Sequence, residues 1–269
     1  FVAPRDDIEQ KLAEIWSEIL GINPVGVKDN FFELGGHSLL AINLMAKIQR
    51  SFDKQLPLST LFTNRTVEDL AKLIPEQKQQ KTSSLVPIQT EGNKQAFFCV
   101  HPAGGNVLSY QELSHTLGNN QPFYGLQAQG FNQGEKVFTK VEDMAEFYVK
   151  NIQEFQPKGA LQIGGWSFGG VVAFEMAQQL LQQGREVSLL AILDSWVPIL
   201  LDPNKKIDNL YLTGALSRYF GGAFGTENFV SEDELAGLKP EDKIEYIFDK
   251  AERFGLFPPE ASRDQNRRF

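Results

Sequence analysis

A serine between two glycines is the first feature of this sequence that could perform chemistry. Gly165, Ser167 and Gly169 form a Gly-x-Ser-x-Gly pattern, which follows the strand-like run 160–163 and precedes an apolar helical run from Val171. A serine at the apex of a strained strand-to-helix turn points into the open, and the glycines let strand and helix approach closely. The N–H groups of the new helix then face developing negative charge. The pattern predicts a nucleophile at Ser167.

Two other predicted strands end in segments that could complete such a site. The apolar strand 95–100 leads into the small-residue turn 101–105, which can offer a backbone N–H to an oxyanion beside the N–H of Phe168. An ordinary glycine turn is the alternative for this segment. The apolar strand 187–193 ends at Asp194, where an acid can orient a histidine. The alternative for this residue is a loop-starting aspartate that caps a turn.

None of the three histidines fits the base that a serine–aspartate pair needs. His101 precedes the nucleophile, although the order in this arrangement is serine, aspartate, histidine. His115 lies on the solvent side of a predicted helix, and His37 is given only a supporting role at a helix start. We expect the sequence to stop before the catalytic histidine, so that the chain as printed is inactive. Cys99 lies in an apolar strand and is expected to be buried rather than reactive.

A second serine lies in a helical context. Ser38 follows two glycines and His37 at the start of an amphipathic helix, where helix N–H groups favour a bound phosphate. A plain N-cap serine is the alternative, and both roles are compatible. The apolar spacing from Ile8 to Leu20 predicts an earlier helix, and Thr66 is placed to cap a later one. The first 75 residues therefore predict a small all-α bundle.

Composition limits the class of protein. The chain has 269 residues, of which 42% are apolar, and its net charge of −8 argues against nucleic acid as a partner. A single cysteine fits a reducing compartment, and no apolar run is long enough to span a membrane. We therefore expect a cytoplasmic protein, and we assign no metal site. Because the sequence begins without Met, we expect a piece of a longer polypeptide.

The remaining pattern predicts an α/β fold. Between residues 95 and 193, near-continuous apolar strands alternate with helices, which indicates a mostly parallel sheet covered on both faces. Residues 205–257 change to helical spacing, for example over 207–220 and 239–254. Residues 76–84 are polar and have the composition of a linker.

The segment around Ser38 resembles a known attachment motif. Residues 29–40, and above all the Leu-Gly-Gly-His-Ser-Leu core at 34–39, resemble the phosphopantetheine-attachment motif of peptidyl carrier domains from nonribosomal peptide synthetases. Polyketide carriers usually have Asp where His37 stands, so the peptide branch is favoured. The resemblance covers about residues 6–75. It implies a four-helix carrier domain with 4′-phosphopantetheine joined to Ser38 through a phosphodiester.

The rest of the chain resembles the thioesterase domains that end nonribosomal peptide and polyketide assembly lines, a branch of the α/β-hydrolase family. That resemblance implies Ser167 as nucleophile, Asp194 as acid, and the N–H groups of Ala103 and Phe168 as the oxyanion hole. It also implies that the helical segment after Asp194 is a lid over the active site. In this family the catalytic histidine follows the lid, after further strands and a helix.

Together the two resemblances predict a carrier domain over 1–75, a linker over 76–84 and a C-terminally incomplete thioesterase domain over 85–269. Such a protein holds a peptide as a thioester on the Ser38 arm and releases it through Ser167, by hydrolysis or cyclisation. The implied partners are upstream condensation and adenylation domains, a phosphopantetheinyl transferase and the peptidyl thioester. Two alternatives stay open: a non-catalytic carrier and docking module, and a polyketide-type carrier and thioesterase.

Overall fold

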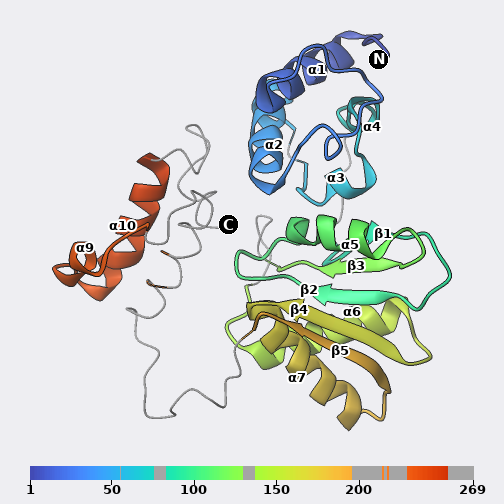
Figure 1. Cartoon of the computed structure of the whole chain (residues 1–269), viewed down its shortest axis with the longest axis vertical. Helices are drawn as coiled ribbons and strands as arrows, with labels where there is room; N and C mark the ends of the chain where they lie inside the picture. The colour runs from blue at the N-terminus through green and yellow to red at the C-terminus, as the bar shows by residue number, and fades with distance from the viewer. Residues whose placement is uncertain are drawn as a thin grey trace. The chain divides into compact units, whose positions relative to one another are not determined.

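The computed structural model describes residues 1–54, 56–75, 83–129, 137–195, 214, 217 and 229–253 (Figure 1). The chain divides into two compact units, and the described residues up to Ser195 belong to the first and those from 214 onward to the second. Most of the predicted linker, most of the predicted helix at 207–220 and the C-terminal residues after 253 lie outside the described residues.

The N-terminal region is the predicted all-α bundle. Its helices are α1 (Asp7–Leu20), α2 (Ser38–Phe52), the short α3 (Thr60–Thr63) and α4 (Val67–Leu73). Their apolar faces meet in a core around Trp16, whose ring meets that of Phe31 edge-on at a centroid distance of 5.2 Å. The helical spacing read from the sequence is therefore confirmed as the packing pattern of this bundle.

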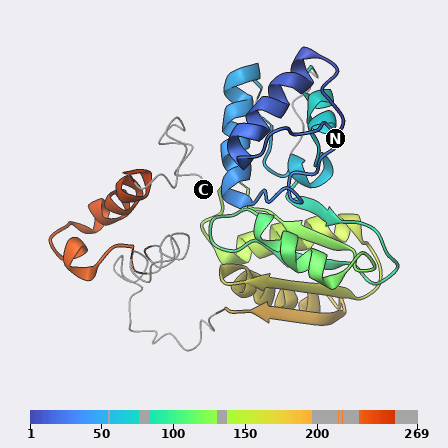
Figure 2. The ribbon, with the colours of Figure 1, turned by 45° about the horizontal axis from the view of Figure 1, so that its top comes forward.

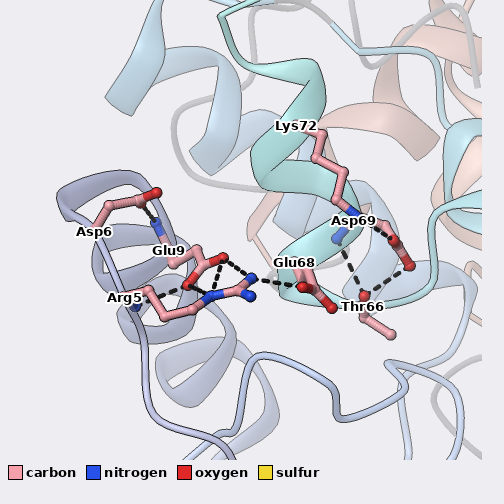
Figure 3. Close-up of polar contacts among 7 residues, drawn as sticks. All are labelled: Arg5, Asp6, Glu9, Thr66, Glu68, Asp69 and Lys72. Atoms are coloured by element: carbon pink, nitrogen blue, oxygen red, sulfur yellow. Dashed lines mark hydrogen bonds and ion pairs between the residues drawn. The ribbon is translucent and has the colours of Figure 1, made fainter.

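A cluster of charged residues joins the start of α1 to the start of α4 (Figure 3). Arg5 binds the carboxylate of Glu9, and its Nη2 also lies 2.6 Å from Oε1 of Glu68 at the start of α4. Glu9 is only 4% exposed, and the hydrogen bonds from Arg5 lower the pKa of its carboxyl. Two separate helix starts are thus tied by one guanidinium.

The second part of the first unit is a five-stranded sheet with the order β1-β3-β2-β4-β5. Its strands are β1 (Leu85–Gln89), β2 (Phe97–Val100), β3 (Phe123–Leu126), β4 (Leu161–Trp166) and β5 (Val187–Leu193). All neighbouring pairs are parallel except β1 and β3, which are antiparallel. The mostly parallel sheet is confirmed. The strand β1 was not predicted, because Pro87 interrupts its pattern, and proline is tolerated at such an edge position.

Helices lie against both faces of this sheet, as Figures 1 and 2 show from two directions. They are η1 (Leu108–Tyr110), α5 (Gln111–Leu117), α6 (Val141–Phe155) and α7 (Phe168–Gln182). Alternate residues of β2 enter separate cores: Phe97 and Cys99 pack with η1 residues, whereas Phe98 and Val100 pack with α6 and α7. Cys99 is fully buried as predicted, and burial raises its pKa to about 12.

The described part of the second unit contains α9 (Glu232–Ala236) and α10 (Pro240–Arg253). Helix α10 confirms the helical spacing predicted over 239–254. Glu234 joins the two helices, because its carboxylate accepts hydrogen bonds from the backbone N–H of Ser231 at 2.8 Å, Tyr246 Oη at 3.0 Å and Lys250 Nζ at 2.6 Å. Among the described residues of both units, no helix has the length and apolarity that crossing a membrane requires.

We predict that Arg5→Met loosens the N-terminal bundle, because it leaves the buried Glu9 carboxylate without its cation. Amide hydrogen exchange measured by mass spectrometry should become faster over α1 and α4. The double variant Arg5→Met with Glu9→Met should recover most of the protection, since both charges are then removed. Lys11→Gln is the control, because Lys11 pairs with Glu14 only at the exposed surface. Unchanged exchange in Arg5→Met would contradict the prediction.

We predict that Glu234 titrates at about 2, since the hydrogen bonds from Lys250 and then Ser231 lower its pKa from 4.5. A carboxyl whose pKa falls on folding stabilises the fold above its unfolded pKa, and that contribution is lost as pH falls from 4.5 toward 2. A carbon-13 NMR titration of the side chain measures the midpoint. Lys250→Gln should raise this midpoint, whereas the control Lys239→Gln should leave it in place. A wild-type midpoint near 4.5 would show that the cluster does not form in solution.

Candidate active site and carrier site

Ser167 lies at the turn between β4 and α7 in a conformation that side chains rarely adopt. Its backbone has φ 55° and ψ −123°. A Cβ on Gly165 would lie 2.1 Å from the carbonyl carbon of Gly169, and a Cβ on Gly169 would lie 2.3 Å from the carbonyl oxygen of Val100. Only glycine fits at either position. The close approach of strand and helix predicted from the Gly-x-Ser-x-Gly pattern is therefore confirmed.

The register of the sheet brings Ser167 and Asp194 to neighbouring positions. Trp166 pairs with Leu193, and the N–H of Ser167 donates to the carbonyl of Leu193 at 2.9 Å. The two candidate residues each follow one member of this pair, so they lie at the carboxyl ends of adjacent parallel strands. Asp194 is exposed and has φ 42°, in the left-handed region that side chains rarely adopt.

The turn 101–105 begins at the carboxyl end of the strand on the other side of β4. Val100 of β2 pairs with Gly165 of β4, so this turn starts beside the serine turn. In parallel sheets ligands bind at this edge. The structure therefore brings all three predicted segments to one place, with β4 in the middle.

The turn itself is held by its own backbone. The N–H of Gly105 donates to the carbonyl of Pro102 at 3.1 Å, and the N–H of Ala128 donates to the carbonyl of Gly105 at 2.9 Å. Gly104 and Gly105 have φ values of 97° and 76°, which favour glycine. Ala103 is exposed between these fixed points. Phe168 is the first residue of α7, and the N–H groups of a helix's first turn have no acceptor within the helix.

His101 is buried behind the turn, and both of its ring nitrogens are engaged. Nδ1 lies 2.8 Å from the carbonyl oxygen of Pro102, and Nε2 lies 2.9 Å from the hydroxyl of Tyr148 on α6. Burial lowers the pKa of His101 to about 4, so the ring is neutral at pH 7. Because a carbonyl can only accept, Nδ1 carries the proton and Nε2 is an acceptor for the Tyr148 hydroxyl, which also lies 3.2 Å from the carbonyl oxygen of Gln127. This ring supports the turn and is not free to act as a base.

The sequence did not indicate this role for Tyr148. The residue falls on the apolar face of α6 and reads as core, and its ring is indeed fully buried. Its hydroxyl is the exception, since a buried hydroxyl needs a partner. The pairing with His101 joins residues 47 positions apart. Only a search for partners among buried polar groups could have suggested it.

Ser38 is the first residue of α2, not its cap. The N-cap is His37, with extended φ and ψ of −135° and 178°, and its side chain makes no capping hydrogen bond. The alternative of a plain N-cap serine is corrected by this boundary. A Cβ on Gly36 would lie 2.4 Å from the ring of Phe31, so glycine is required just before the helix start. His37 is exposed, and the first turn of α2 carries no acidic residue.

The remaining histidines lie on other elements. His37 belongs to the N-terminal helical bundle, and His115 is exposed on α5. Only His101 lies against the serine turn, with its ring centroid 6.1 Å from that of Phe168. None of the three is therefore assigned as the base.

Two family models match this chain. Residues 95–230 match the thioesterase domain family, and residues 10–74 match the family of the phosphopantetheine attachment site. The first match covers half of the chain and includes both the Ser167 turn and Asp194. The second includes Ser38.

Similar curated proteins are multidomain synthetases. A dimodular nonribosomal peptide synthase of Bacillus subtilis (strain 168) is 44% identical over 194 residues, which are 72% of this chain and 8% of that protein. An atromentin synthetase of Tapinella panuoides is 33% identical over 270 residues, which are 97% of this chain and 27% of that protein. The chain thus spans a small part of these relatives.

A solved structure has a similar fold. A four-domain nonribosomal peptide synthetase in its holo form, bound to AMP and glycine, aligns with a TM-score of 0.63 and 32% identity, over 100% of this chain and 20% of that one. These matches favour the peptide branch over the polyketide alternative. The chain belongs to the thioesterase domain family, and it joins this domain to a phosphopantetheine carrier domain as nonribosomal peptide synthetases do.

Proposed function

We propose that this chain performs the last step of a peptide assembly line, with Ser38 as the carrier site and Ser167 as the nucleophile that releases the product. The observation that carries the proposal is the meeting of the Ser167 turn, Asp194 and the turn 101–105 at the carboxyl ends of β4, β5 and β2. The carrier domain in the same chain would supply a tethered, covalent source of substrate for this site.

The start of α2 fits a phosphodiester on Ser38. Helix N–H groups and the positive end of the helix dipole favour an anion there, and no carboxylate in the first turn opposes it. The neighbouring Gly35 and His37 are exposed, so the approach is open. When attached, 4′-phosphopantetheine supplies a thiol that holds the acyl chain as a thioester. Ser38 would hold the group through its oxygen, and the backbone N–H groups of α2 would face its phosphate.

At the second site Ser167 attacks the thioester carbonyl. A bond forms between Ser167 Oγ and the carbonyl carbon, the carbon–sulfur bond breaks, and the serine proton passes through a base to the departing sulfur. The N–H groups of Ala103 and Phe168 would stabilise the oxyanion, and Asp194 would orient and stabilise the charged base. Water or a nucleophile within the acyl chain then releases the product from Ser167.

The identity of the catalytic base separates this proposal from the alternative of a non-catalytic carrier and docking module. We assign the base to none of the three histidines. Both ring nitrogens of His101 are already hydrogen-bonded, and His37 and His115 lie on other elements. This observation also supports the second candidate, in which the thioesterase-like part only binds the carrier. Acyl transfer must therefore be tested in the complete protein, where any further catalytic group is present.

The partners and domain limits follow from the same proposal. Condensation and adenylation domains would load the carrier, and a phosphopantetheinyl transferase would modify Ser38. We propose the domain limits 1–75 for the carrier, 76–84 for the linker and 85–269 for the thioesterase part. The family matches over 10–74 and 95–230 fall within the first and the last of these ranges. The described helices α9 and α10 fall within the sequence segment 205–257 that is proposed as the lid.

Treatment with a phosphopantetheinyl transferase and coenzyme A should add the mass of one phosphopantetheine group. Ser38→Ala should abolish the gain completely, because Ser38 carries the only side-chain hydroxyl in residues 35–41. Ser51→Ala is the matched control, since it removes an exposed serine from the other end of α2. Intact-mass spectrometry gives the result. A gain that persists in Ser38→Ala would place the attachment elsewhere.

Ser167→Ala in the complete protein should reduce turnover of a short acyl thioester by roughly 10⁴-fold or more, because the acyl group has no oxygen to join. Mass spectrometry should find the acyl-enzyme only when Ser167 is present. The matched control is Ser109→Ala, an exposed serine on η1. Equal acylation in Ser167→Ala would refute the nucleophile, and no turnover by the wild type would favour the non-catalytic candidate.

A further inference from the structure

Near the Ser167 turn, some neighbouring strands keep their backbone hydrogen bonds to the strand end and others do not. Beyond β2, the N–H of His101 still donates to Leu126 of β3 at 2.9 Å. Beyond β4, the N–H of Ser167 still donates to Leu193 of β5 at 2.9 Å. Between β2 and β4, the last register pair is Val100 with Gly165. The sheet therefore opens between these two strands, directly before the turn 101–105 and the serine turn.

The hydroxyl of Tyr110 fills this opening. It donates to the carbonyl oxygen of Val100, and it accepts from the N–H of Trp166 at 3.0 Å. A hydroxyl can donate and accept at once, so one group satisfies both backbone groups at the strand ends. Trp166 immediately precedes Ser167. The bridge thus connects the last residue of β2 to the residue before the nucleophile.

Tyr110 is held firmly in this place. Only 2% of the residue is exposed, and its ring lies 5.8 Å from that of Phe123. The segment before it packs against the sheet, since a Cβ on Gly125 would lie 2.7 Å from Cβ of Val107. Burial raises the pKa of the Tyr110 phenol, so the hydroxyl keeps its proton at physiological pH.

We propose that Tyr110 is a positioning residue for acyl transfer, whose hydroxyl sets the separation between the oxyanion turn and the nucleophile. The proposal rests on the function proposed above for Ser167 and Ala103. Tyr110 does not touch the acyl group. It acts through the ends of β2 and β4, which carry the two parts that must lie on either side of the reacting carbonyl.

The surrounding contacts leave little room for another arrangement. If the hydroxyl is removed, the Val100 carbonyl and the Trp166 N–H lose their shared partner, and direct pairing would require β2 and β4 to close together. Gly169 already packs against the Val100 carbonyl at a distance that admits no Cβ. Closing or opening the gap therefore moves Ser167 relative to Ala103. A misplacement of about 1 Å at a reacting centre can cost about 10²-fold in rate.

The test compares Tyr110→Phe with the wild type in the complete, phosphopantetheine-loaded protein, using a short acyl thioester. We expect kcat to fall by about 10- to 100-fold, while KM changes by less than about twofold, because the substrate contacts remain. The matched control is Tyr124→Phe on β3, whose ring packs against Phe98 and Phe155. This variant should keep both kinetic constants.

A parallel Ser167→Ala variant separates the two proposals. If Ser167→Ala keeps its activity, the function proposed for Ser167 is wrong. If Ser167→Ala loses activity and Tyr110→Phe keeps the wild-type kcat, Tyr110 is not a positioning residue. A change confined to KM would overturn the inference too, since it would assign Tyr110 to substrate binding.

Thermal unfolding shows whether Tyr110→Phe is folded at the assay temperature. If it is not, 4-aminophenylalanine at position 110 replaces it, because the amine still donates to Val100 but accepts poorly from the Trp166 N–H. A kcat between those of the wild type and Ser167→Ala, with little change in KM, is then expected. A wild-type kcat in that variant would contradict the inference.

Discussion

The structure around Ser167 depends on the very close approach of helix α7 to the ends of β2 and β4. Gly165 and Gly169 permit this approach, because a Cβ at either position would collide with backbone atoms. The approach forces the positive φ of Ser167 and places the first turn of α7 beside the turn that follows Val100. The proposed nucleophile and oxyanion donors are therefore positioned by segments that backbone packing holds together.

The two serines share one structural feature in different surroundings. Ser38 begins α2 and Ser167 immediately precedes α7, so each lies at a helix start, where the first N–H groups have no acceptor within the helix. Before Ser38, Gly35 and His37 are exposed, which suits the phosphodiester proposed there. At Ser167 the turn is strained and half-buried between neighbouring strands, which suits a transient oxyanion.

Much of this arrangement could be predicted, because glycine spacing and apolar periodicity are local signals. They gave the serine turn and the bounds of β5 and α6, and they indicated the helical bundle. The strand β1 was missed because Pro87 disrupts its local pattern. Tyr110 and Tyr148 were missed for another reason: each lies at an apolar position, and its hydroxyl bonds to groups distant in sequence, such as Trp166. Local patterns carry no information on such pairs.

These buried groups share an electrostatic property that follows from their surroundings. Burial raises the pKa values of Tyr110 and Tyr148 and lowers that of His101, so all three stay neutral near pH 7. Because these three side chains do not change protonation near pH 7, their hydrogen bonds keep the same direction. We call these three side chains the neutral framework. The pH dependence of catalysis near neutrality must then come from groups outside this framework.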